Sequence, residues 1–200
     1  MNRISARLRP DLAVIASHVA AGAKVLDIGC GDGTLMGALR DERGCDARGL
    51  ELEPHNVAKC VEQGLSAIQG DADTDLALYP DASFDYAILS QTLQTTKRPD
   101  LVLEELLRIG RQAFVSFPNF AHWRVRMDLL TRGRMPVTRL LPVAWYETPN
   151  IHHLTIADFR DFLDQRGIRT QGAWFLAGDA TITPTLANWR AEHAVFLLSR

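Results

Sequence analysis

The stretch from Val25 to Arg40 reads VLDIGCGDGTLMGALR. A short apolar run is followed by Gly29, Gly31 and Gly33, spaced two apart, and then by a leucine-rich helical pattern. A glycine-rich turn lets the backbone approach a ligand closely, and the helix that follows offers its N-terminal amides to that ligand. The stretch therefore predicts a strand, a ligand-binding turn and a helix.

The rest of the chain extends this pattern. Short apolar runs alternate with helical periodicity, and strands alternating with helices are typical of an α/β, Rossmann-like doubly wound sheet. The chain ends in two further apolar runs, which we expect to pair as antiparallel strands at a sheet edge. The predicted strands cover residues 24–28, 47–52, 65–70, 84–90, 112–117, 174–176 and 194–198, and the predicted helices cover 34–43, 54–63 and 99–109.

The length of 200 residues, with 46% apolar residues, favours a single domain over residues 1–200. Between about 120 and 152 the pattern changes to arginines among bulky residues and prolines, which we interpret as an inserted cap. Thr155 and Asp158 have the spacing of a capping box, so a helix should begin there and end before Gly167.

Composition argues against several function classes. A net charge of -2 gives no overall attraction to nucleic acid, and no stretch has transmembrane length. The three cysteines lack the C-x-x-C spacing of zinc or disulfide frameworks, so we expect no metal site and a reducing, cytoplasmic location.

Asp27 indicates the charge of the ligand. Its carboxylate lies two residues before Gly29 and should sit close to whatever the turn holds. A unit-charge contact near 4 Å is worth about 1 kcal/mol in water and about 4 kcal/mol at a protein-like dielectric constant. Asp27 should therefore repel a pyrophosphate and favour S-adenosylmethionine (SAM), which carries a sulfonium and an ammonium group. A nicotinamide oxidoreductase is further disfavoured because its fingerprint needs glycine where Thr34 stands.

Two more acids follow predicted strands. Glu51 is placed to accept hydrogen bonds from ribose hydroxyls, and Asp71 from an adenine amino group. Ser90 and Gln91, after the fourth strand, are further candidates for cofactor contacts. The alternative for these side chains is local: strand-end polar groups often cap the next helix or turn.

The motif VLDIGCGDG resembles the first motif of the class I SAM-dependent methyltransferase superfamily. This resemblance implies a sheet of seven strands, mostly parallel with the last strand antiparallel. It also implies cofactor contacts, to SAM or S-adenosylhomocysteine, at Asp27, Gly29, Gly31, Glu51 and Asp71.

Further stretches, among them LRPDLAVIA, SFDYAILSQTLQ and the segment ending in YETPNIHHLTIADF, resemble the narrower MetW family between about residues 8 and 162. The resemblance implies a role in methionine biosynthesis beside a MetX-like homoserine O-acyltransferase.

The sequence offers no definite catalytic base. The fourth strand ends in SQTLQ, which supplies hydrogen bonds but no strong base. His122 and His152 are the candidates, and structural roles are the alternative for both. Candidate substrate or partner residues are Asn119, Arg124, Tyr146 and Asn150. Two hypotheses remain: a SAM-binding partner of the acyltransferase, or a methyltransferase acting on an unidentified small molecule.

Overall fold

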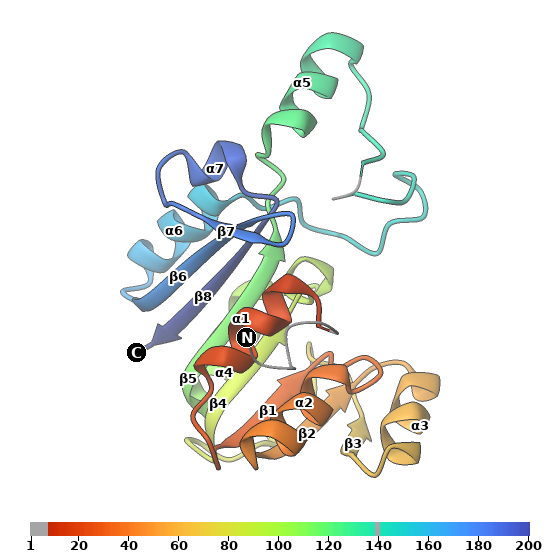
Figure 1. The fold of residues 1–200 in the computed structure, drawn as a ribbon, viewed down its shortest axis with the longest axis vertical. Helices are drawn as coiled ribbons and strands as arrows, with labels where there is room; N and C mark the ends of the chain where they lie inside the picture. The colour runs from red at the N-terminus through yellow and green to blue at the C-terminus, as the bar shows by residue number, and fades with distance from the viewer. Residues whose placement is uncertain (1–7, 139–140) are drawn as a thin grey trace.

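The computed structural model describes residues 8–138 and 141–200, which form one eight-stranded sheet with helices on both faces (Figure 1). The strand order is β3-β2-β1-β4-β5-β8-β6-β7. The first five strands run parallel, β6 is antiparallel to β8, and β8 is antiparallel to β5. The strands are β1 Lys24–Ile28, β2 Asp46–Glu51, β3 Ser66–Gln69, β4 Phe84–Ser90, β5 Gly110–Pro118, β6 Arg169–Ala177, β7 Ala180–Ile182 and β8 His193–Ser199.

Helices cover the two faces because successive strand residues point in opposite directions. Val25 packs under α1 and α2, whereas its neighbour Leu26 packs on the other face with α4 and α6. The same alternation recurs at Ile88 and Leu89 of β4. The helices are α1 Pro10–His18, α2 Thr34–Arg43, α3 Pro54–Glu62, α4 Pro99–Ile109, α5 Trp123–Arg132, α6 Ile156–Gln165 and α7 Ala187–Arg190, with 3₁₀ turns η2 Leu76–Leu78 and η3 Leu93–Thr95.

The doubly wound fold is confirmed, and the strand count is corrected from seven to eight. The additional strand, β7, folds back on β6 as an antiparallel hairpin. β7 therefore forms the edge of the sheet next to β6, while β8 lies between β5 and β6 with four of its seven residues buried. The predicted capping box is confirmed, since Thr155 Oγ1 accepts from Asp158 N–H and the Asp158 side chain accepts from Thr155 N–H.

Between β5 and α6 the chain leaves the sheet. We call the described residues of this segment, 119–138 and 141–155, the arm. In Figure 1 α5 stands away from the sheet beyond the tip of β5, and the chain then returns to α6. The arm begins at the carboxyl edge of the sheet, which is where ligands bind in open α/β sheets.

In the described ranges no helix is long and apolar enough to cross a membrane.

Candidate functional site at the carboxyl edge of the sheet

The turn between β1 and α2 requires glycine for two separate reasons. Gly29 and Gly33 have φ of +71° and +81°, a backbone region that other residues seldom adopt. A Cβ on Gly29 would also lie 2.5 Å from Thr92 Oγ1, so the turn packs directly against the loop after β4. At Gly31, by contrast, a Cβ would meet nothing within 4 Å, which leaves open space above the turn.

Three carboxylates line up along this edge, because β1, β2 and β3 are neighbours and all end here. Glu51 Oε2 accepts from Gly31 N–H at 2.7 Å, and Glu51 Oε1 accepts from Glu53 N–H at 3.0 Å. Asp71 Oδ1 accepts from Asp73 N–H at 2.9 Å. These backbone donors fix the orientation of Glu51 and Asp71.

Two cavities flank Gly29. The first, which we call the Glu51 cavity, has a volume of about 350 Å³ and is lined by Glu51, Asp71, Ala72 and Thr95. The second, the Asp27 cavity, has a volume of about 330 Å³ and is lined by Arg9, Asp27, Gly31 and Ser90. Gly29 lines both cavities, so the bend of the turn separates two charged spaces. Among the described residues, the Glu51 cavity is lined by four acids and Lys97, and the Asp27 cavity by Asp27, Asp32 and Arg9.

Asp27 is 2% exposed. Burial raises the pKa of its carboxyl group to about 7; Arg9 opposes this shift, and Glu51 adds to it. A buried acid in this state gains most from a ligand that brings a positive charge.

A buried network holds Arg9 beside Asp27. Asp11 Oδ2 accepts from the hydroxyls of Ser90 at 3.0 Å and Ser116 at 2.8 Å, which ties α1 to the ends of β4 and β5. Arg9 Nη2 in turn donates to Ser90 Oγ at 2.9 Å. Ser90 thus lines the Asp27 cavity, as its predicted cofactor role requires, but its hydroxyl is already engaged within the protein.

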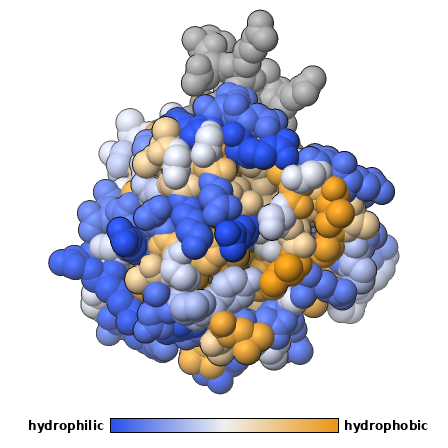
Figure 2. All heavy atoms as spheres, turned by 90° about the horizontal axis from the view of Figure 1, so that it is seen from below, coloured by the Kyte–Doolittle hydropathy of each residue, from blue (hydrophilic) through white to orange (hydrophobic). Residues whose placement is uncertain are grey.

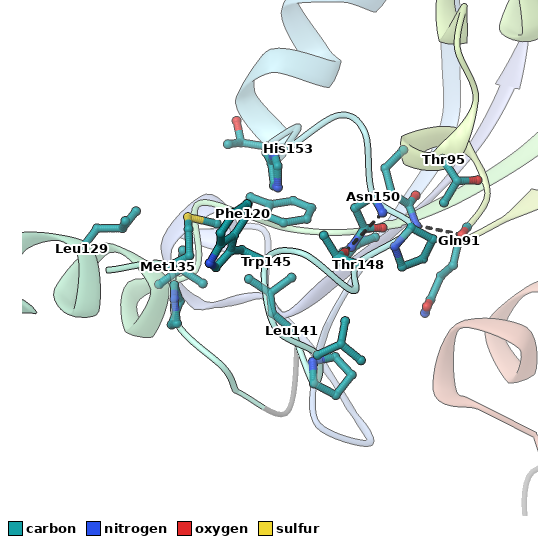
Figure 3. Close-up of a pocket in the computed structure, with 18 residues that line it drawn as sticks. Gln91, Thr95, Phe120, Leu129, Met135, Leu141, Trp145, Thr148, Asn150 and His153 are labelled. Atoms are coloured by element: carbon teal, nitrogen blue, oxygen red, sulfur yellow. Dashed lines mark hydrogen bonds between the residues drawn. The ribbon is translucent and has the colours of Figure 1, made fainter. Parts of the chain in front are cut away.

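A third and larger cavity, the Phe120 cavity, opens under the arm with a volume of about 910 Å³ (Figure 3). Thr95 lines both it and the Glu51 cavity, so the two spaces adjoin at η3. Its floor is an apolar cluster of Phe120, Val125 and Leu141.

Comparison with known proteins assigns the chain to a family. The sequence model described as "Methionine biosynthesis protein MetW" matches residues 9–198. The chain belongs to the MetW family. It is also 36% identical over 170 residues to the bifunctional methionine biosynthesis protein MetXA/MetW of Rhodopirellula baltica, an alignment that covers 80% of this chain.

Two other similarities are broader. A ubiquinone biosynthesis O-methyltransferase of Xylella fastidiosa is 33% identical over 130 residues, covering 61% of this chain. The chain spans 27% of the length of the MetXA/MetW protein and 52% of the length of the O-methyltransferase. A crystal structure of an S-adenosylmethionine-dependent methyltransferase from Mesorhizobium loti superposes with a TM-score of 0.70 at 16% identity, covering 96% of this chain and 98% of the other. This likeness shows that the MetW-family chain has the methyltransferase fold.

The two catalytic candidates lie outside the three cavities, and the His152 Nε2 atom is buried with no hydrogen-bond partner among the described residues. His122 is buried at the start of α5, where Nδ1 accepts from Arg124 N–H at 3.4 Å. Burial lowers the pKa of the His122 ring, which favours the neutral form that capping needs. His152 follows Ile151, and both backbone N–H groups donate to the Gln94 carbonyl. Neither histidine lines the three cavities, so the catalytic role of both stays a prediction.

The four substrate or partner candidates separate into different environments. Asn119 is fully buried, and its amide bonds to the Asn188 and Ala191 carbonyls and to the Ala121 and Ile156 N–H groups, which joins β5 to α6 and α7. Asn150 lines the Phe120 cavity. Arg124 and Tyr146 are exposed on the arm, with the Arg124 guanidinium 5.3 Å from the centre of the Trp123 ring.

Sequence reasoning missed Arg9, and it named Gln94 only as one of several hydrogen-bonding residues after the fourth strand. Arg9 lies within LRPDLAVIA, which was used only for the family resemblance. Nothing in that stretch predicts that α1 packs over the end of β4, which is what brings Arg9 to Ser90. Gln94 is buried and lines the Phe120 cavity, and its Oε1 has no hydrogen-bond partner in the described ranges. Only the fold brings these side chains to the cavities.

Proposed function

We propose that this MetW-family chain binds SAM or S-adenosylhomocysteine at the turn around Gly29 and acts with a homoserine O-acyltransferase in methionine biosynthesis. The observation that carries the cofactor proposal is the buried Asp27, which lines a cavity that Arg9 also lines.

The chemistry of the cavity residues matches the parts of the cofactor. In the Asp27 cavity, Asp27 would attract the ammonium group, and the Arg9 guanidinium would pair with the carboxylate of the methionine part. In the Glu51 cavity, Glu51 would accept from the ribose hydroxyls and Asp71 from the adenine amino group, with Ala72 leaving room for the ring. The space above Gly31 is open, so the bonds that join the methionine part of the cofactor to its adenosine part could pass there from one cavity to the other.

A dinucleotide fits this edge poorly. Its pyrophosphate would lie at the same turn, where Asp27 would face its negative charges. Glu51 would accept from a ribose in either ligand class, so the discrimination rests on Asp27.

Binding, rather than catalysis, is the primary role that we assign to the cofactor. The loop after β4 offers Gln91, Thr92 and Gln94, and none of these is a strong base. A methyl group transferred from SAM would leave the sulfonium sulfur as a thioether and form one new bond to an acceptor, so a base is needed only when the acceptor keeps a proton. Methyl transfer is the second candidate function; it is favoured by the Phe120 cavity, which adjoins the Glu51 cavity at Thr95 and could hold an acceptor.

The partner proposal rests on the bifunctional MetXA/MetW relative. The name of that protein pairs a MetW part, which this chain resembles, with a second component of methionine biosynthesis. The arm supplies a surface for it. On α5, Trp123, Met127 and Leu130 are exposed at spacings of four and three, which places them on one stripe of the helix. Exposed Trp, Met and Arg side chains are enriched at protein interfaces.

The opposite end of the molecule is less suited to a partner. Seen from below, hydrophilic side chains predominate, and the most apolar residues form small, separate groups (Figure 2). The outer stripe of α5 is therefore the surface that we assign to the acyltransferase.

Cofactor binding is tested by isothermal titration of the chain with SAM, S-adenosylhomocysteine and NADH. We expect both adenosyl compounds to bind and NADH not to bind at millimolar concentration. Absence of adenosyl binding, or tight NADH binding, would contradict the proposal.

The partnership is tested by co-expression with a homoserine O-acyltransferase from the same genome, followed by affinity purification and assay of acyl transfer with and without SAM. Wild type should co-purify with the enzyme, and Trp123→Glu with Met127→Glu should remove this association. The control is Leu78→Glu with Val61→Glu, which places the same two charges at exposed apolar residues of η2 and α3, far from α5 in the chain. Equal loss in both variants would refute the docking surface, and no co-purification of the wild type would refute the partnership.

A further inference from the structure

The Phe120 cavity has the composition of a small-molecule site. Its volume of about 910 Å³ lies within the usual range of such sites, which is about 300 to 1,000 Å³. We propose that the Phe120 cavity binds a neutral, mostly apolar small molecule that carries one hydrogen-bond donor.

The apolar part of the site is built by α5 and the chain that follows it. Val125 and Leu129, one helical turn apart, face the cavity, while the stripe of Trp123, Met127 and Leu130 lies on another side of the helix. Figure 3 shows Leu129, Met135 and Trp145 together at one side of the cavity. This side can bury a hydrocarbon or aromatic body.

Charged ligands are disfavoured here. The described residues that line the cavity include no Asp, Glu, Lys or Arg, and their one ionisable side chain is His153. The His153 ring stands edge-on to Phe120, with the ring centres 4.7 Å apart. An ionised group that entered such surroundings would lose part of its hydration without gaining an opposite charge, so its transfer from water is unfavourable.

The other side of the cavity is polar and close to the Glu51 cavity. Figure 3 shows Gln91, Thr95 and Asn150 on this side. Gln91 has φ of +51°, which is uncommon for a residue other than glycine and is typical of residues held in place at functional sites.

Gln94 determines which polar group the ligand should carry. Its Nε2 donates to the Gln91 carbonyl at 2.7 Å, so the orientation of the amide is fixed. Its Oε1 is buried and accepts no hydrogen bond from the described residues. An unpaired buried acceptor is destabilising, and a donor on the ligand would satisfy it after a small adjustment of the side chain.

The inference deepens the proposed function, because it names the class of molecule that would lie beside the cofactor, but binding in this cavity does not depend on SAM. The two proposals can therefore fail separately. An acceptor for methyl transfer or a second effector would both belong to this chemical class.

Three related fluorescent probes test the proposal on the full chain. N-phenyl-1-naphthylamine is neutral and aromatic and has one N–H donor, and 8-anilinonaphthalene-1-sulfonate adds a sulfonate to the same skeleton. The N-methyl derivative of the first probe lacks the donor. We expect saturable binding of the neutral amine, at least about tenfold weaker binding of the sulfonate, and about threefold to tenfold weaker binding of the N-methyl derivative.

A matched pair of variants locates the bound probe. Leu129 lines the cavity and is 44% exposed, whereas its neighbour Leu130 is 79% exposed and is not among the lining residues. Leu129→Glu should weaken binding of the neutral amine at least about tenfold, and Leu130→Glu should leave it within about twofold. Titration of both variants with SAM should give the wild-type affinity, which separates this cavity from the cofactor site.

Several outcomes would overturn the proposal. These are no saturable binding of the amine, equal binding of the amine and the sulfonate, equal effects of Leu129→Glu and Leu130→Glu, and competitive displacement of the amine by SAM. The last result would place the probe in the cofactor cavities instead.

Discussion

The Gly29 turn and the arm lie at the same edge of the sheet but are built differently. At the turn, the candidate ligand-binding residues Asp27, Gly29 and Gly31 lie within a few positions of one another. The carboxylates of Glu51 and Asp71, at the ends of nearby strands, are held by backbone N–H groups. In the arm, the cavity is assembled from β5, α5, η3 and the chain before α6, and most of its polar side chains bond within the protein. A local motif predicts chemistry well, whereas an assembled cavity has no local pattern to read.

Substitution of Asp27 should have the largest effect. The pKa of its carboxyl group is about 7 in the folded chain and 3.8 when unperturbed. Since the folded state binds the proton more tightly, the stability from this group is fully present below about pH 4 and is lost as the pH rises to about 7. Asp27→Asn removes that loss, so the variant should be more stable than wild type by up to about 4 kcal/mol near pH 8.

The same variant should bind SAM more weakly, by roughly 1 to 3 kcal/mol, which is about tenfold to a hundredfold. Urea unfolding between pH 4 and 8 and isothermal titration provide the two measurements. Asp46→Asn is the control, because it removes an exposed carboxylate at the first residue of β2. It should change the unfolding free energy by less than about 0.5 kcal/mol. Parallel pH profiles of wild type and Asp27→Asn would show that Asp27 is not a destabilising buried acid.

Gly29→Ala should have the next largest effect. The new Cβ would lie 2.5 Å from Thr92 Oγ1 at a φ of +71°, so we expect a loss of about 2 to 4 kcal/mol in the free energy of unfolding. Gly37→Ala is the control, because Gly37 lies within α2 and a Cβ there meets nothing within 4 Å. That variant should gain up to about 1 kcal/mol, since alanine favours helix. Equal stability of the two variants in chemical denaturation would mean that the turn tolerates side chains.

Arg9→Gln should have a smaller effect that concerns the ligand. Arg9 lines the Asp27 cavity and is 52% exposed, so its pairing with a ligand carboxylate is partly screened by water. We expect the affinity for SAM to fall about fivefold to twentyfold in isothermal titration. Arg48→Gln is closely matched, because Arg48 is also 52% exposed and also pairs with an aspartate two residues away. Similar losses in both variants would indicate a general charge effect rather than a contact.

The smallest effect should come from the outer surface of the arm. Trp123→Ser removes an exposed ring, so the unfolding free energy of the free chain should change by less than about 0.5 kcal/mol. Val125→Ala, two residues away and buried, should cost about 1 to 3 kcal/mol. A large loss from Trp123→Ser in thermal or urea unfolding would mean that this ring serves folding rather than a partner.

The positions of residues with a local signal in the sequence were predicted well. The three acids and the glycine turn were identified because strand ends and glycine spacing are visible in the chain, and the Thr155–Asp158 box because its two partners are three residues apart. Asn119 and His122 were selected as functional candidates because they follow a strand end. Their burial and internal hydrogen bonds depend on α6, α7 and the start of α5, whose positions the pattern does not give.

By itself, the amino-acid sequence determined the doubly wound sheet, the bend at Gly29 and the row of acids at Asp27, Glu51 and Asp71, because periodicity, glycine spacing and strand ends are local properties. Only the tertiary structure decided that Arg9 lies beside Asp27, that Gln94 is buried with an unpaired oxygen, and that α5 divides into a cavity-lining side and an exposed stripe. These features depend on contacts between segments far apart in the chain, and such contacts form only when the helices pack on the sheet.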